Sequence, residues 1–165
     1  MKTLLIVRHA KSSWDNPSLS DFDRPLNDRG HNDAPRMGKR LKEKDLTPDI
    51  IISSPANRAF TTSKIIAESI GFPVSSIVTN RNLYHATEDE ILDVVHSLNE
   101  KTDVVMLFGH NPGLTDFVNS ITKSHIDNIP TCGIVACKFK VDRWKDIAWG
   151  KGKVLFFDYP KARKD

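Results

Sequence analysis

The chain has 165 residues, of which 39% are hydrophobic and 27% are charged. These values are typical of a soluble globular domain and exclude a disordered chain or a membrane protein, and the length predicts one domain over residues 1–165. The 24 basic and 21 acidic residues give a net charge of only +3. This nearly even balance of charges does not indicate nucleic acid as a partner.

The apolar run that opens the chain is too short to be a targeting or membrane segment. It extends over residues 4–7 and stops at Arg8, so neither an export signal nor a membrane span is expected. The only cysteines, Cys132 and Cys137, are five residues apart in a strand-like stretch, which predicts reduced thiols on opposite sheet faces. Reduced thiols in turn predict a cytoplasmic location. No Cys and His residues have zinc-ligand spacing, so neither a metal nor a cofactor is expected.

Three short apolar runs predict the strands of a parallel sheet. They cover residues 3–7, 49–53 and 103–108 and are rich in Ile, Val and Leu. Continuous apolar runs of this length suit strands that are buried on both faces.

The first predicted helix carries Met37 and Leu41 on its apolar side. A helix that began at Asn27 would contain Pro35, which would kink it, so a start near Asp33 is expected.

The second predicted helix covers residues 56–70. Ser54 is expected to be its N-cap, Pro55 its first helical residue and Gly71 its end.

Two further helices follow from apolar stripes. Thr87 and Glu90 have the spacing of a capping box and introduce the first stripe. The stripe residues are Ile91, Val95 and Leu98 in one helix and Leu114, Phe117, Val118 and Ile121 in the other.

Two strand-like runs at residues 133–141 and 153–159 complete the pattern, with a turn around Gly150 and Gly152. They predict an antiparallel edge. The alternation of strands and helices before them predicts an α/β fold, a three-layer α/β/α sandwich around a mostly parallel central sheet.

Charged and titratable residues follow the predicted parallel strands. Arg8 and His9 follow the first, Arg58 comes shortly after the second, and His110 follows the third. In open α/β sheets, ligands bind at the carboxyl ends of the strands. Each residue alone has an ordinary structural explanation, but their shared position at one sheet edge predicts a common site.

Two arginines and two histidines at one edge predict a site for a phosphoryl group. Guanidinium groups match phosphoryl oxygens bidentately, and a helix beginning at Asn111 would add backbone N–H donors. A neutral imidazole can attack phosphorus and form a phosphohistidine intermediate. The expected activity is therefore a metal-independent phosphatase.

Three motifs resemble those of the histidine phosphatase superfamily, which is phosphoglycerate mutase-like in fold. They are Arg8-His9-Ala10, Ser53-Ser54-Pro55-Ala56-Asn57-Arg58-Ala59 and Gly109-His110-Asn111-Pro112. The small size and the stretch Asp23-Arg24-Pro25-Leu26 before Gly30 are most similar to the SixA-type branch, the short phosphohistidine phosphatases.

The resemblance implies that His9 is the nucleophile, that Arg8 and Arg58 clamp the phosphoryl oxygens, and that His110 stabilises the transition state. Ala10 replaces the family's usual glycine and would be strained if its backbone required a positive φ.

Several neighbouring residues are candidates for secondary roles. Lys11, Ser12, Ser13 and Asn111 are close enough in sequence to contact substrate. Glu88 and His85 are the candidates for a general acid. Glu88, Asp89 and Glu90 are also explained by their place in the first turn of a helix, where acids interact favourably with the helix dipole, so the acid stays unassigned.

The expected substrate is phosphohistidine on a protein, because an imidazole leaving group demands less of a general acid than an alkoxide does. A small-molecule phosphomonoesterase or a phosphoglycerate mutase-like enzyme is the alternative, since the fold does not fix the substrate. A non-catalytic phosphoprotein-binding module is a third hypothesis. Neither nucleic acid nor a membrane is expected as a partner.

Overall fold

A six-stranded sheet forms the middle layer of the computed structural model, which describes residues 1–165, and its strand order is β3-β2-β4-β1-β5-β6. The pairs among β1, β2, β3 and β4 are parallel, whereas β5 and β6 are antiparallel to their neighbours. This confirms the predicted sheet. The strands are β1 (Lys2–Arg8), β2 (Ile50–Ser53), β3 (Val78–Thr79), β4 (Val104–Gly109), β5 (Ile134–Phe139) and β6 (Lys153–Asp158).

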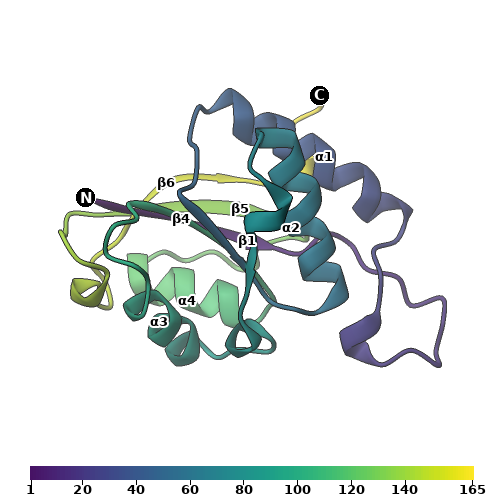
Figure 1. The fold of residues 1–165 in the computed structure, drawn as a ribbon, viewed down its shortest axis with the longest axis horizontal. Coiled ribbons are helices and arrows are strands. Elements are labelled where there is room, and N and C mark those ends of the chain that lie inside the picture. The colour runs from purple at the N-terminus through teal and green to yellow at the C-terminus, as the bar shows by residue number, and fades with distance from the viewer.

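Helices cover both faces of the sheet, as Figure 1 shows. Helices α1 (Asp28–Glu43) and α2 (Asn57–Ile70) lie on one face, and α3 (Glu88–His96) and α4 (Gly113–Thr122) lie on the other. The predicted three-layer α/β/α sandwich is thereby confirmed.

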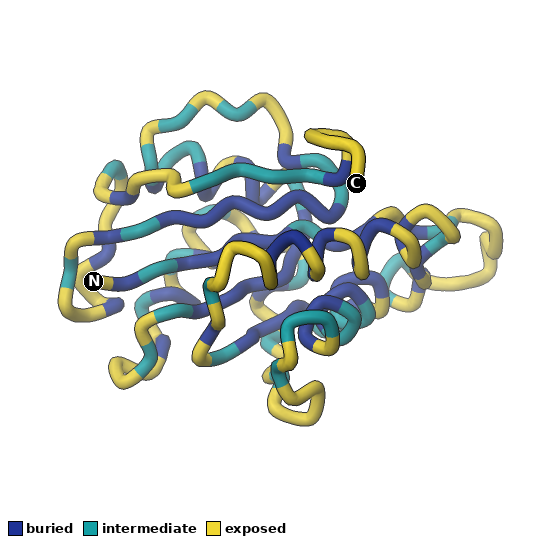
Figure 2. Tube along the Cα trace, turned by 90° about the horizontal axis from the view of Figure 1, so that it is seen from above, coloured by how far each residue is buried: buried dark blue, intermediate teal, exposed yellow.

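Strand β1 separates two hydrophobic cores because its side chains alternate between the faces. Leu4 and Ile6 pack in the core with α3 and α4, whereas Leu5 and Val7 pack in the core with α1 and α2. All four are fully buried, and Figure 2 shows the central strands as a buried band. A continuous apolar run was therefore the correct signal for a strand covered on both sides.

The cysteines lie in different cores, as their spacing predicted. Cys137 belongs to the core under α3 and α4, and Cys132 to the core under α1 and α2. Both are buried free thiols.

The expected start of the first helix near Asp33 is wrong, because α1 begins at Asp28 and contains Pro35. The Asn27 side chain accepts a hydrogen bond from the Gly30 N–H and caps the helix. This cap and the buried face of α1 outweigh the bond that an internal proline removes.

Two other helix starts also differ from the prediction. Helix α2 begins at Asn57, and its N-cap position is Ala56 rather than Ser54. Helix α4 begins at Gly113, two residues after the expected Asn111. The two residues that were expected at the helix starts still bond to nearby backbone. Ser54 Oγ accepts the Ala56 N–H, and Asn111 Oδ1 accepts the Thr115 N–H.

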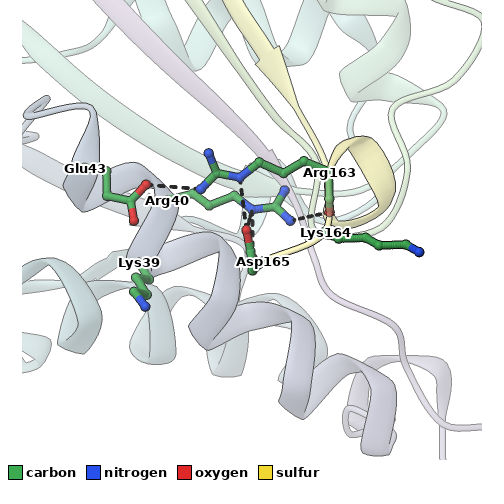
Figure 3. A pocket seen from close by; sticks show the side chains of 6 residues that line it. All are labelled: Lys39, Arg40, Glu43, Arg163, Lys164 and Asp165. Carbon is green, nitrogen blue, oxygen red and sulfur yellow. Dashed lines mark hydrogen bonds and ion pairs between the residues drawn. The ribbon is translucent and has the colours of Figure 1, made fainter.

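The carboxyl-terminal segment is held against α1 by Arg40, whose guanidinium is buried and bonds to Asp158, Asp165 and backbone carbonyls. Figure 3 shows Arg40 bonded to Asp165, with Arg163 also reaching Glu43. The hollow beside it has a volume of about 430 Å³. Because Arg40 has partners for its donors, we interpret this cluster as structural. None of the helices is both long and apolar enough to cross a membrane.

Candidate active site

The sheet order places three strand ends next to one another. β1 and β2 flank β4, all three run in the same direction, and Arg8 pairs with Gly109 as Ser53 pairs with Phe108. The residues that follow these strands therefore share one edge. His9 and His110 lie there with a distance of 5.2 Å between ring centroids.

His9 is held as a neutral imidazole with one accessible nitrogen. Its Nδ1 lies 2.7 Å from the Ala10 carbonyl oxygen, a partner that only accepts, so Nδ1 carries the proton. Burial lowers the pKa of His9 to about 3, although the bond to Ala10 acts in the opposite direction. Nearby arginines lower it further. Nε2 makes no hydrogen bond and is not buried, so its lone pair is available for attack.

His110 is oriented by Ser54, which is fully buried. His110 Nε2 lies 2.8 Å from Ser54 Oγ, and that oxygen already accepts the Ala56 N–H. The buried hydroxyl proton of Ser54 has no other acceptor than His110 Nε2, and a bond in this direction assigns the ring proton to Nδ1. Nδ1 is buried and has no partner. A buried donor without a partner is suited to bind an oxyanion.

Burial also lowers the pKa of His110 to about 3, and His9 and Arg58 act in the same direction. Both site histidines are consequently neutral at neutral pH.

Two arginines at the site lie close enough to affect one another. Burial lowers the pKa of Arg8, and the charge of Arg58 adds to this effect. Arg8 donates one hydrogen bond to the Ile129 carbonyl, and its Nε is buried without a partner. Repulsion between two held guanidinium groups favours an anion between them.

The long segment between β1 and α1 supplies two further charged residues that our sequence analysis did not assign to the site. The Asp21 carboxylate accepts hydrogen bonds from Arg58 through Oδ2 and from Arg24 through Oδ1, at 2.9 and 3.0 Å. Tyr84 adds a bond of 2.7 Å to Oδ2. Desolvation opposes the shift, but these donors hold the pKa of Asp21 well below its usual range.

A cavity of about 150 Å³ opens onto these groups. Its lining contains four cationic side chains and the nucleophile candidate His9, whose ring centroid is 5.2 Å from that of His110. Four positive charges around so small a cavity match a dianion such as a phosphoryl group. The lining residues are Arg8, His9, Lys11, Ser12, Trp14, Arg24, Arg58 and Thr131.

The sequence and the fold both match known histidine phosphatases. A sequence model of the histidine phosphatase superfamily (branch 1) matches residues 4–83. The Agrobacterium tumefaciens structure described as a phosphohistidine phosphatase SixA superposes with a TM-score of 0.81 and 25% identity, over 96% of this chain and 98% of that one. The chain belongs to the histidine phosphatase superfamily.

Two further proteins are also similar to this chain. The structure of the protein histidine phosphatase SixA complexed with tungstate has a TM-score of 0.82 at 21% identity, over 96% of this chain and 97% of that one. A 2,3-bisphosphoglycerate-dependent phosphoglycerate mutase of Chelativorans sp. is 37% identical over 73 residues, 43% of this chain. That match spans only 35% of the mutase.

The structure explains how Ala10 can replace the glycine that is usual in this superfamily. Ala10 is not among the residues with positive φ, so the turn does not need glycine. Its Cβ is buried in the core under α1 and α2, and its N–H donates to Thr62 Oγ1. The strain that the sequence suggested is therefore absent.

The four candidate substrate contacts of this histidine phosphatase have different positions. Lys11 and Ser12 line the cavity, and Ser12 Oγ accepts a bond from Arg24. Ser13 lies outside it and offers its carbonyl to Arg24. Asn111 bonds to Asn128 and Thr115 and thus stabilises the loop and the start of α4. Only Lys11 and Ser12 are placed for direct contact with a phosphoryl group.

The two candidates for the general acid, Glu88 and His85, make different contacts. Glu88 Oε2 accepts a hydrogen bond of 2.6 Å from Ser120, and Glu88 lines a separate hollow between α3 and α4. His85 lines the same hollow, but its Nε2 is 3.1 Å from Asp21 Oδ2 and its ring centroid is 5.7 Å from that of His110. No group of three or more His, Cys, Asp or Glu residues could hold a metal ion.

Proposed function

We propose that this protein is a phosphatase that transfers the phosphoryl group of a protein-bound phosphohistidine to His9 and then to water. The observation that carries the proposal is the neutral His9, with Nδ1 bonded to the Ala10 carbonyl and Nε2 accessible beside four cationic side chains. Membership of the histidine phosphatase superfamily supports a phosphatase activity.

In the first step, His9 Nε2 forms a bond to phosphorus as the P–N bond of the substrate breaks. The leaving imidazole nitrogen takes a proton from solvent. Arg8, Arg24 and Arg58 neutralise the phosphoryl oxygens, and His110 Nδ1 donates a hydrogen bond to one of them.

In the second step, water attacks the phosphorus and the bond to His9 breaks. Inorganic phosphate leaves, and His9 returns to its neutral form, held by the Ala10 carbonyl. The low pKa of about 3 keeps most of the imidazole unprotonated between turnovers. No step requires a metal, since the arginines supply the positive charge.

The ionised state of Asp21 favours phosphohistidine over alkyl phosphates as substrate. Asp21 is the carboxylate bound to Arg58, and its depressed pKa keeps it ionised, so it cannot donate a proton at neutral pH. An alkoxide leaving group needs a general acid, whereas a P–N bond to imidazole is labile without one. This argument also disfavours the small-molecule phosphomonoesterase and the mutase-like enzyme.

The test compares kcat/KM on a histidine-phosphorylated protein with that on phosphoserine peptides and small alkyl phosphates. The proposal expects much higher values on the P–N substrate, and equal or higher values on the esters would contradict it. Rapid acid-free quench should trap phosphate on a histidine in the wild type. The His9→Ala variant should lose both turnover and trapped phosphate, whereas His125→Ala, at an exposed histidine, serves as the matched control.

A non-catalytic binding module is the remaining alternative. Turnover of any phosphorylated substrate that depends on His9 excludes it.

A further inference from the structure

A second hollow on the protein surface adjoins the phosphoryl cavity. That hollow has a volume of about 470 Å³ and shares three lining residues with the cavity: Lys11, Ser12 and Trp14. The cavity itself, at about 150 Å³, accommodates little beyond the phosphoryl group. The remainder of a substrate must therefore lie outside it, and the second hollow is in the size range of ligand sites.

Trp14 lines both hollows. Its side chain is 73% exposed, the most of any large hydrophobic residue in the chain. Packing in a core does not explain this position, because Trp14 belongs to neither hydrophobic core. An exposed tryptophan at the mouth of a binding cavity is a typical anchor for a partner.

The indole is held in place by the phosphoryl site itself. The guanidinium carbon of Arg24 lies 3.2 Å from the Trp14 ring centroid, so Arg24 covers one face of the ring. Arg24 is buried and fixed by bonds to Asp21 and to the Ser13 carbonyl. The exposed fraction of Trp14 means that its other face is open. A fixed aromatic surface costs little conformational entropy when a ligand binds.

The segment that carries Trp14 is also paired rather than loose. The Ser13 N–H donates to the Pro25 carbonyl at 2.8 Å, and Ser12 forms an antiparallel bridge with Leu26. The Asn27 N–H adds a bond to the Lys11 carbonyl at the base. Figures 1 and 2 show the outer part of this segment extending from the body of the protein as an exposed loop.

From these contacts we infer that Trp14 and the hollow beside it bind the polypeptide segment that carries the phosphohistidine, so that Trp14 determines specificity for the leaving group. This inference rests on the proposed function. Polar and charged residues around the indole suit a peptide backbone with mixed side chains rather than an apolar ligand; they include Lys11, Asp15, Asn27, Asp28 and Arg29.

The experiment uses three P–N substrates with one phosphoryl group and leaving groups of increasing size. These are phosphoramidate, which releases ammonia, N-phosphoimidazole, and a histidine-phosphorylated peptide. The Trp14→Ala variant should lose at least tenfold more kcat/KM on the peptide than on phosphoramidate. Trp14→Phe, which keeps an aromatic ring, should recover most of the kcat/KM that Trp14→Ala loses on the peptide.

Trp149→Ala is the matched control, because Trp149 packs edge-on against Phe117 of α4 and lines neither hollow. It should leave the ratio between substrates unchanged. Equal losses of Trp14→Ala on all three substrates would overturn the inference, since Trp14 would then act only through Arg24. If Trp14→Ala does not fold, the same comparison with Trp14→Leu decides between the outcomes.

The wild type separates this inference from the proposed function. If the wild type hydrolyses the P–N substrates well and Trp14→Ala keeps their ratio, only the inference fails. If the wild type prefers phosphate esters, both fail.

Discussion

Ser54 is a residue that would set the chemistry of the site without touching the substrate. Its hydroxyl bonds to His110 Nε2, which places the ring proton on Nδ1. The sequence identified Ser54 as a helix cap and as part of the motif at residues 53–59, but not as a partner of His110. Its partner could not be predicted, because the contact depends on β2 and β4 being neighbours in the sheet.

Removing this hydroxyl should weaken the oxyanion donor. We expect Ser54→Ala to lower kcat roughly tenfold or more with little change in KM, which is less than the ~10² to 10³ typical of deleting a direct donor. Ser54→Thr, which keeps the hydroxyl, should recover the rate. Nitrogen NMR shifts of His110 provide an independent measurement, and an Nδ1–H form that persists in Ser54→Ala would refute the role.

Asp21 and Glu88 make a contrasting pair of carboxylates. Asp21 bridges Arg24 and Arg58, so Asp21→Asn should weaken the positioning of both guanidinium groups and lower kcat/KM by about tenfold or more on every substrate. Glu88→Gln should change kcat/KM less than twofold, because Glu88 bonds to Ser120 away from the cavity. Steady-state kinetics on the two purified variants makes the comparison. A large loss in Glu88→Gln would identify Glu88 as the acid after all.

At the scale of elements, the sequence predicted the helices and most strands but not where three of the helices begin. The capping box of Thr87 and Glu90 and the left-handed Gly71 are found where they were expected. These signals are local. The start of α1 at Asp28 was missed, because Pro35 outweighed the local cap residue Asn27 in the prediction; Asn27 is also held by the distant Lys11 carbonyl.

Gly30 in the first turn of α1 controls how this helix meets the site. A Cβ at Gly30 would overlap the Lys11 carbonyl oxygen, which accepts the Asn27 N–H. Gly30→Ala should therefore destabilise the protein by about 1–3 kcal/mol, as overpacking does, and lower kcat/KM by displacing Lys11 and Ser12. Urea unfolding and kinetics measure the two effects.

The exposed His31 in the same turn offers the control, and His31→Ala should change stability by less than about 0.5 kcal/mol. An unchanged or increased stability of Gly30→Ala would show that the Lys11 segment can move freely.

At the scale of the whole molecule, the order of the strands brings the site together, and this order is what the sequence left open. His9, Arg58 and His110 could be predicted because each follows a strand or begins the next helix. Asp21 and Arg24 come from a segment without helical or strand periodicity, which gives no indication of where it folds. Arg24 appeared only in the Asp23-Arg24-Pro25-Leu26 stretch that carried the resemblance, and Asp21 was not identified.

The burial of two neutral histidines makes the stability of the whole protein depend on pH. In the unfolded chain both take up protons near pH 6.5, whereas in the folded protein their pKa values are lowered to about 3. Below pH 6.5 the unfolded state therefore binds more protons, and the folded state loses stability as the pH falls toward 3. Between pH 7 and 5 each histidine should remove about 2 kcal/mol from the free energy of unfolding.

Urea unfolding at a series of pH values measures this loss. His9→Gln and His110→Gln should each reduce the dependence on pH by about half, because each removes one buried titrating group. His125→Gln should keep the full dependence, since His125 is exposed. The paired carboxylate Asp21, with its depressed pKa, contributes in the same direction only at lower pH. A wild-type stability that stays constant from pH 7 to 5 would mean that the folded protein takes up these protons too, and His9 would then not be held as a neutral nucleophile.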